Sequence, residues 1–478
     1  MMRIRLLILC LLLTTISKAQ KEANNWFFGE NVGLRFNGSS KPTVSSGSLN
    51  TLEGCASISD KDGNLLFYSD GTSVWNKNHS LMPNGQDLLG DSSSSQSAII
   101  VPNPDKPNIY YLFTVGSTVK PSGFYYYTVN LDLNNGLGDI EGDPVDLTGN
   151  YEGELWSEKI TAVETETCES YWVITLTNNK YLAFKVDSNG VNPTPITSTV
   201  DFKSSQSRGY LKVSPQGTKL AAAHQGKTPK LSGLYLYDFN NETGRVTNEK
   251  ALFDEFTTGG IEAPYGVEFS PNTTKLYTST VDGIKEFTYR LYQYDLETDD
   301  IRSSKTLIHE EIGYRGALQL GPDQKIYVTI PEEYEIGTHF LDVIHNPESK
   351  GKFCDFEKDY IDFGSRFSMQ GLPPFIQSLF VIDEINIVNP YENLSLENKN
   401  LELCFGNSYT LQGPLIAGAD YFWTFNDVIL PTPSSPNQLI VNNEGIDSKG
   451  LYKLMVKTHD ACDTQLIGEA NVSFTTEP

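Results

Sequence analysis

"GYLKVSPQGTKLAAAHQ" (209–225) and "PYGVEFSPNTTKLYTST" (264–280) are two versions of one pattern in this sequence. Each has an alternating apolar stretch, a turn that contains proline, and a second stretch rich in small, apolar or aromatic residues. Alternation with a period of two on both sides of a Pro, Gly or Asn turn is typical of a β-hairpin. The pattern therefore predicts a repeated strand–turn–strand unit.

A third copy, "LGPDQKIY" (320–327), sets the period of the repeat. The turn prolines Pro215, Pro271 and Pro322 are 56 and 51 residues apart, which is close to the length of a propeller blade. A further strand with an aromatic-Asp-apolar end follows each hairpin, as in "LYLYDFNNETGR". We therefore expect units of four antiparallel strands.

Earlier hairpins are predicted around the turns at 60–64, 104–108 and 166–170, and one more near Pro373, which makes seven. The stretch 24–36 reads as a strand pair without its own hairpin, so we expect it to complete the last blade. The predicted fold class is an all-β chain with a seven-bladed β-propeller over 24–385. Rings of six or eight blades remain alternatives, whereas a tandem array of sandwiches does not explain a period of about 50 residues.

A different pattern follows a predicted linker at 386–400. Cys404, Trp423 and Cys462 occur in the order found in immunoglobulin-like sandwiches, although no tyrosine precedes Cys462 by two residues. The segment 401–478 is thus predicted to be a small immunoglobulin-like or PKD-like β-sandwich. In an oxidising compartment a Cys404–Cys462 disulfide would stabilise it by about 3 to 5 kcal/mol.

Three further cysteines, Cys55, Cys168 and Cys354, lie among apolar or aromatic residues at spacings that match no metal motif. They are predicted to be buried thiols. The pentapeptide "DKDGN" (60–64) opens like a calcium loop, but Gly71 stands where such a loop needs a bidentate glutamate. The prediction is a turn without a metal.

The first nineteen residues have the features of a signal peptide. Arg3 and Arg5 precede an apolar run that is too short to span a bilayer, and "SKA" (17–19) offers small residues before a cleavage site. The whole sequence carries a formal charge of −24, and loss of its three N-terminal basic residues leaves 33 basic against 60 acidic ones. We expect a secreted, soluble protein that binds no nucleic acid and inserts into no membrane.

Four stretches of this chain carry a family resemblance: "NNWFFGENVGLRF", "EGCASISDKDGNLLFYSDGTSVWNKNHSLMPNG", "SSSSQSAIIVPNPDKPNIYYLFTV" and "GLPPFIQS". They resemble the secreted, WD40-like propeller proteins of gliding Bacteroidetes-type bacteria, which often carry PKD or immunoglobulin-like repeats. The resemblance implies a cell-surface protein, exported by the type IX system and associated with gliding motility. It also implies a partner in the envelope or the secretion apparatus.

In a propeller, the segments that enter the innermost strands converge around the central channel. The residues that this places near one end of the channel are Glu53, Gln96, Lys159, Arg208, Tyr265, Arg315 and Gln370, with Asp70 and Asp282 from neighbouring loops. Mixed charges and aromatic rings suit an extracellular ligand rich in hydroxyl groups, such as a glycan, or a peptide. The alternative is that these side chains only fill and hydrate the channel.

The sequence contains no zinc-binding histidine pair, no Gly-x-Ser-x-Gly elbow and no phosphate-binding Gly-rich loop, so no catalytic residue, metal or cofactor is predicted. The leading hypothesis is therefore a surface binding or adhesion protein. A second is a propeller polysaccharide lyase or glycosidase that uses Glu53, Tyr265 and an arginine. A third is a structural subunit of a surface apparatus.

Overall fold

The computed structural model describes most of the chain. The described residues are 21–38, 41–117, 123–151, 153–203, 208–226, 232–254, 262–282, 287–381, 383–385, 387–388, 400–404, 408–426, 428–442, 448–458 and 465–475. The predicted signal peptide and most of the predicted linker lie outside them. Within these residues the secondary structure is β-strands and short 3-10 turns, and no helix is long and apolar enough to cross a membrane.

The repeat seen in the sequence builds four-stranded antiparallel sheets. The first clear copy forms β16 (Leu211–Val213), β17 (Lys219–His224), β18 (Gly233–Asn240) and β19 (Arg245–Asp254), paired in that order. Its turn is held locally, because the Ser214 hydroxyl oxygen accepts hydrogen bonds from the backbone N–H groups of Thr218 and Lys219. Ser270 has the same role in the next copy, where it accepts the N–H of Lys275 at 2.9 Å.

The next two copies follow the same strand order. They are β20 (Ala263–Phe269), β21 (Lys275–Asp282), β22 (Thr288–Asp295) and β23 (Thr306–Ile312), and then β24 (Leu318–Leu320), β25 (Ile326–Val328), β26 (Phe340–Ile344) and β27 (Phe356–Asp362). The predicted hairpins around Pro271 and Pro322 are thus the strand pairs β20–β21 and β24–β25.

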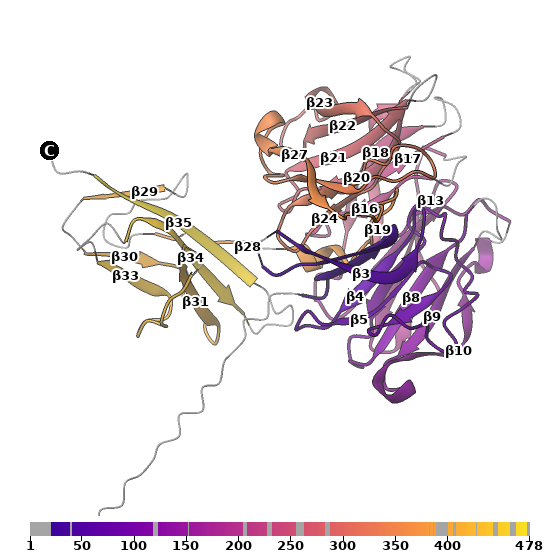
Figure 1. Ribbon diagram of the computed structural model, residues 1–478, viewed down its shortest axis with the longest axis horizontal. Helices are drawn as coiled ribbons and strands as arrows, with labels where there is room; N and C mark the ends of the chain where they lie inside the picture. The colour runs from indigo at the N-terminus through magenta and orange to yellow at the C-terminus, as the bar shows by residue number, and fades with distance from the viewer. Residues whose placement is uncertain are drawn as a thin grey trace, which may run out of the picture.

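Four earlier sheets complete this part of the chain. Their strands are β1 (Asn25–Phe28), β2 (Glu30–Arg35) and β3 (Thr43–Asn50); β4 (Ala56–Ser59), β5 (Leu65–Ser69) and β6 (Val74–Asn76); β7 (Ala98–Pro102), β8 (Ile109–Val115), β9 (Phe124–Asn130) and β10 (Asp139–Asp146); and β11 (Thr161–Glu164), β12 (Tyr171–Thr177), β13 (Lys180–Asp187), β14 (Gly190–Val191) and β15 (Ile196–Thr199). The described residues up to Asp362 therefore form seven antiparallel sheets, which Figure 1 shows gathered into one body.

The sheets follow one another as in a propeller, with their first strands side by side. Contacts run from β4 to β7, from β7 to β11, and on through β16 and β20 to β24. Between β24 and the start of β4 lies an extended segment at 367–371. There the Ala317 N–H donates to the Gln370 carbonyl at 2.8 Å, and the Gln370 N–H donates to the Leu52 carbonyl at 2.9 Å.

The same extended segment meets the N-terminal sheet, since the Glu30 N–H donates to the Phe367 carbonyl at 2.9 Å. Residues 24–36 were predicted to complete the last blade; β1 and β2 pair with β3 in a sheet of their own, and this hydrogen bond joins that sheet to the extended segment. The hairpin predicted near Pro373 was wrong. Residues 372–376 form no named strand and lead into the 3-10 turn Gln377–Phe380, because Pro373 and Pro374 have no N–H to donate to a strand ladder.

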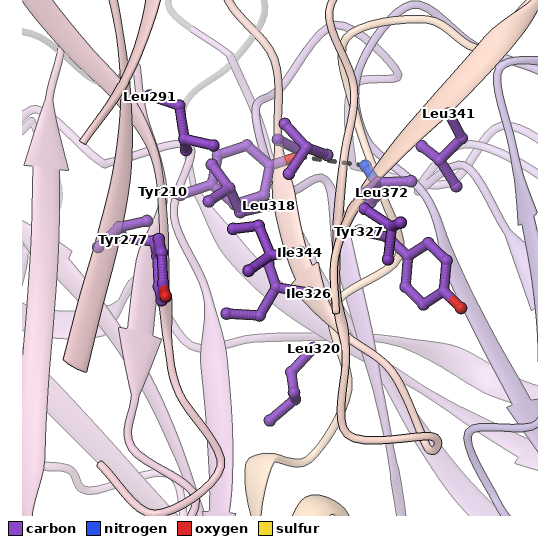
Figure 2. Close-up of a cluster of buried hydrophobic side chains, with 14 of the residues drawn as sticks. Tyr210, Tyr277, Leu291, Leu318, Leu320, Ile326, Tyr327, Leu341, Ile344 and Leu372 are labelled. Atoms are coloured by element: carbon purple, nitrogen blue, oxygen red, sulfur yellow. Dashed lines mark hydrogen bonds between the residues drawn. The ribbon is translucent and has the colours of Figure 1, made fainter. Parts of the chain in front are cut away.

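Buried aromatic and branched side chains hold adjacent sheets together. Trp26 of β1 is fully buried, and its ring centroid lies 4.8 Å from that of Phe36, 5.5 Å from that of Tyr327 and 5.8 Å from that of Phe375. The N-terminal sheet is thereby packed onto the sheet of β25 and onto the segment that follows β27. Figure 2 shows the neighbouring cluster, in which the Leu372 N–H donates to the Tyr210 phenol oxygen at 3.4 Å.

The C-terminal strands form a second body with its own core (Figure 1). They are β28 (Asp383–Glu384), β29 (Asn400–Cys404), β30 (Ser408–Gln412), β31 (Asp420–Phe425), β32 (Val428–Ile429), β33 (Gln438–Asn442), β34 (Gly450–Lys457) and β35 (Gln465–Thr475). One sheet has the order β28-β35-β34-β31-β32, with β29 also on β35, and the other is the pair β30-β33. Since β28 pairs with β35, this sheet takes in residues that the predicted boundary at 385 assigned to the propeller.

Trp423 is buried in the core that the two C-terminal sheets share, and its indole N–H donates to the Pro436 carbonyl at 3.0 Å. The predicted partner cysteine of Cys404, Cys462, lies outside the described residues, so the disulfide stays a prediction. Cys55 and Cys354 are free, buried thiols, as predicted. Cys168 differs, because it lies half-buried with a positive φ of 56° on the turn between β11 and β12.

Candidate functional site

Four of the nine predicted site residues meet in one buried cluster. The Arg315 guanidinium, just before β24, donates from Nη2 to Glu53 Oε1 at 2.6 Å and from Nε to Gln370 Oε1 at 2.8 Å. The Tyr265 hydroxyl of β20 donates to the other Glu53 oxygen at 2.9 Å. Arg315 also lies over the Tyr265 ring, with 4.6 Å between its guanidinium carbon and the ring centroid. We call Glu53, Tyr265, Arg315 and Gln370 the axial cluster.

The axial cluster is sealed from solvent. The side chains of Glu53 and Arg315 are each 1 % exposed, and Tyr265 and Gln370 are fully buried. Burial raises the pKa of Glu53, and the positive charge of Arg315 opposes that rise. Although burial also works against the charge of Arg315, the Glu53 carboxylate keeps the pKa of the guanidinium above its ordinary value. Burial, and next the nearby carboxylate, raise the pKa of the Tyr265 phenol well above its usual range.

A second group of predicted residues joins three neighbouring sheets. Gln96, before β7, accepts the N–H groups of Leu211 and Ile160 on Oε1 at 2.8 and 3.3 Å, so it connects β7 with β16 and β11. Lys159 Nζ donates to the Arg208 carbonyl at 2.6 Å. Burial lowers the pKa of Lys159 to about 7, and the neighbouring Glu158 carboxylate limits that fall.

Sequence reasoning missed a third polar group on the innermost strands. Lys212 Nζ and Glu268 Oε2 lie 2.8 Å apart, both side chains are 0 % exposed, and Lys212 also donates to Gln319 Oε1. Each of these three residues stands three positions before a turn proline of the repeat, in "LKVSP", "VEFSP" and "LQLGP". A polar side chain at the same register in three otherwise apolar strands was the signal that could have found them.

Two of the other five predicted residues, Asp70 and Asp282, have local partners. Asp70 Oδ1 accepts the Thr72 and Ser73 N–H groups at 2.8 and 2.7 Å, which makes it a turn-stabilising residue. Asp282, at the end of β21, has its Oδ2 atom 3.0 Å from Arg290 Nη1 in a partly buried ion pair. Neither carboxylate is bonded to the axial cluster among the residues that the structure describes, and the shared ligand-binding face of all nine residues stays a prediction.

The second interpretation of the predicted residues, that their side chains only fill the channel, therefore fits most of them. These side chains fill the centre of the propeller, and their polar groups form hydrogen bonds with one another. Arg208 differs because it is half-buried. Its guanidinium forms no hydrogen bond or ion pair with another residue that the structure describes, and its charge lowers the pKa of Glu53. Gln225 is also half-buried, and it accepts a hydrogen bond from Arg315 Nη1.

Exposed apolar side chains lie directly beyond the axial cluster. The Arg315 guanidinium carbon is 5.3 Å from the Tyr314 ring centroid and 6.0 Å from that of Tyr334. Phe287 packs edge-on against Tyr314 at 4.7 Å, and Tyr314 and Tyr334 lie 6.1 Å apart. Phe287 is 40 % exposed, Tyr334 38 %, and Ile312, which pairs with Thr288, 74 %. We call Phe287, Ile312, Tyr314 and Tyr334 the aromatic rim.

The aromatic rim was not predicted, because its residues lie in loops and at strand ends without a shared motif. The segments "IGYRG" and "EEYEIG" carry it, and an aromatic residue flanked by glycine or glutamate in a loop was the only sequence signal. Two surface clefts of about 520 and 420 Å³ lie elsewhere and share Gln86, Asp87 and Leu88. Neither cleft is lined by a predicted site residue.

Among the residues that the structure describes, no group of three or more His, Cys, Asp or Glu side chains could hold a metal ion. The "DKDGN" segment is a turn held by Asp60, whose Oδ1 accepts the N–H groups of Asp62 and Asn64 at 2.9 and 2.8 Å. His224, at the end of β17, is 1 % exposed, and neither of its ring nitrogens has a hydrogen-bond partner among the described residues. Burial, and then the nearby Lys159 charge, hold the pKa of His224 well below its usual value.

No protein-family model matches the sequence, and no curated protein matches it significantly. Several solved structures are similar in fold. A protein from Bacteroides uniformis, provisionally described as a 6-phosphogluconolactonase, is 12 % identical with a TM-score of 0.44, over 73 % of this chain and 98 % of that one. The Dos1 propeller is 11 % identical with a TM-score of 0.42, over 73 % and 87 %. An oligogalacturonate lyase in complex with manganese is 15 % identical with a TM-score of 0.35, over 61 % and 73 %. At these values none of them assigns an activity or a ligand to this chain.

Proposed function

We propose that this chain is an extracellular binding protein whose ligand contacts the aromatic rim of a seven-bladed propeller. In this proposal the seven sheets are the blades, and the pairing of Glu30 with Phe367 closes the ring. The C-terminal strands are an immunoglobulin-like or PKD-like sandwich that acts as a spacer or second contact. The ligand is a glycan or a protein at the cell surface, where the chain acts in adhesion.

One observation carries the proposal: a fully bonded polar plug lies directly beneath exposed aromatic rings. Glu53 and Gln370 of the axial cluster, together with Gln225, hold Arg315 in place. Arg315 lies beside the rings of Tyr314 and Tyr334. Exposed rings on a rigid base lose little conformational entropy when a ligand is bound. Monomeric proteins rarely expose contiguous apolar side chains unless these bind something.

The extracellular location rests on the sequence of the first nineteen residues and on the acidic balance of the chain. Gliding-motility or type IX association rests on the resemblance alone. The hypothesis of a lyase or glycosidase has less support, because both oxygens of Glu53 are occupied and the side chain is 1 % exposed. A general acid or base must reach its substrate.

Binding screens with the full chain test the proposal. An array of neutral and acidic glycans, together with extracellular proteins, should yield at least one ligand that Tyr334→Ala weakens by about tenfold or more, the scale of a rim aromatic. Phe353→Ala is the matched control, since Phe353 is 71 % exposed and lies outside the aromatic rim. A ligand that both variants bind as well as the original chain would place binding elsewhere and overturn the proposal.

A further inference from the structure

The aromatic rim is bordered by unpaired negative charge. Glu332, Glu333 and Glu335 flank Tyr334 in the loop between β25 and β26, and all three are exposed. None of them forms an ion pair with a residue that the structure describes. The nearby carboxylates on β23 are different, since Glu310 is paired with Arg290 and Glu311 with Lys358.

The loop that carries these glutamates is fixed to the rest of the propeller. The Tyr334 carbonyl accepts the Gln370 side-chain amide at 2.6 Å, which ties the loop to the axial cluster. The Glu333 N–H donates to the Ile336 carbonyl at 3.0 Å, and the Tyr314 N–H donates to the Pro331 carbonyl at 2.7 Å. The rings and the charges are thus held in place before any ligand arrives.

Among the residues that the structure describes, the positive charge near the rim is either neutralised or on another sheet. Arg315 is paired with Glu53, while Arg208 precedes β16 and forms no ion pair with another described residue. The described residues that the β20–β23 and β24–β27 sheets contribute to the rim and its border therefore carry a net negative charge, on a chain whose formal charge is already −24. Such a surface attracts cations and repels carboxylated or sulfated sugars within a Debye length of about 8 Å.

We infer that the aromatic rim binds a basic peptide segment, with a Lys or Arg side chain stacked on the Tyr314 and Tyr334 rings and its charge facing Glu332, Glu333 and Glu335. This inference rests on the proposed binding function and names the ligand class. Cation–π stacking and ion pairing then act on the same side chain. The apolar surface of Phe287 and Ile312 takes an aliphatic or aromatic neighbour in the bound segment.

The test uses decalysine, the same peptide with every lysine acetylated, and tetragalacturonate, each titrated into the full chain at two salt concentrations. Decalysine should bind, the acetylated peptide should not, and affinity should fall as salt rises. The triple variant Glu332→Gln, Glu333→Gln, Glu335→Gln should bind decalysine at least tenfold more weakly than the original chain. Tyr334→Ala should weaken decalysine binding by about the same factor. The matched control is Asp105→Asn, Asp143→Asn, Asp299→Asn, which removes the same charge from exposed positions outside the rim and should change affinity less than threefold.

Equal weakening by the two triple variants would show nonspecific attraction to an acidic protein and overturn the inference. Tetragalacturonate binding that is lost in Arg208→Gln, without decalysine binding at the rim, would also overturn it. That result would leave the proposed binding function standing if Tyr334→Ala abolished the sugar binding. If neither probe nor any glycan or protein on the array depends on Tyr334, both the inference and the proposed function fail.

Discussion

Replacing Glu53 by glutamine should remove a large part of the stability of the propeller. The substitution keeps the shape of the side chain but leaves the Arg315 guanidinium, which is 1 % exposed, without its counter-ion. An unpaired buried charge typically costs about 3 to 5 kcal/mol. We expect a loss of about 3 kcal/mol, because the remaining hydrogen bonds from Arg315 to Gln370 and Gln225 survive.

The stability of the Arg315→Met variant should depend on pH differently from that of the Glu53→Gln variant. It leaves Glu53 buried and unpaired, so the pKa of this carboxyl rises further than burial already raises it. A raised folded-state pKa means that the folded protein takes up a proton where the unfolded chain does not. The stability that protonated Glu53 contributes is then present at low pH and is lost as pH rises through the folded-state pKa. The deficit of Arg315→Met relative to the original chain should therefore be smaller at pH 5 than at pH 7.

The double variant Glu53→Gln, Arg315→Met completes the cycle. Because neither residue is then charged, its loss should fall short of the summed single losses by about 2 kcal/mol, within the range measured for buried coupled pairs. The assay is urea unfolding of the full chain, monitored by the fluorescence of the buried Trp26 and Trp156. The slope of the unfolding free energy against urea concentration should be the same for all variants, which checks that each unfolds in a single transition. A Glu53→Gln loss below about 1 kcal/mol, or additive single losses, would refute a buried, mutually dependent ion pair.

Three other outcomes are expected. His224 should lower stability by about 1 kcal/mol for each pH unit below about 6.5, because the unfolded chain protonates it and the folded chain does not, whereas Glu164 and Asp342, whose pKa burial raises to about 7, act in the opposite direction. The stability difference between His224→Phe and the original chain should therefore grow in favour of the variant by that amount per pH unit in unfolding measured from pH 7 to 5, and a constant difference would contradict it. Gly371→Ala should prevent or strongly weaken folding, since a Cβ there would lie 1.6 Å from the Glu53 carbonyl oxygen, whereas Gly364→Asn, at an open position with φ +67°, should melt as the original does. Deleting residues 24–36 should abolish cooperative melting of the propeller because Trp26 and its contacts are lost, and a truncated chain with the same melting curve would disprove that closure.

The sequence alone was enough to predict the repeated unit. A serine or glycine before each turn proline and a period of two in the flanking strands are local signals, because backbone turns and side-chain alternation depend on neighbours a few residues apart. They located the strand pairs β16–β17, β20–β21 and β24–β25 and the all-β class. They also placed Glu53, Tyr265, Arg315 and Gln370 near one axis.

The tertiary structure alone decided what those residues do there. Glu53 and Arg315 are 262 positions apart, and only packing of the sheets brings their charges to 2.6 Å and excludes water from them. The same packing turned predicted ligand-binding side chains into a buried plug and left the half-buried Tyr314 and the exposed Tyr334 beside it. It also replaced the expected hairpin at Pro373 with a segment that pairs with the N-terminal sheet. Exposure and long-range pairing depend on how every sheet packs against the next, and no local pattern contains that information.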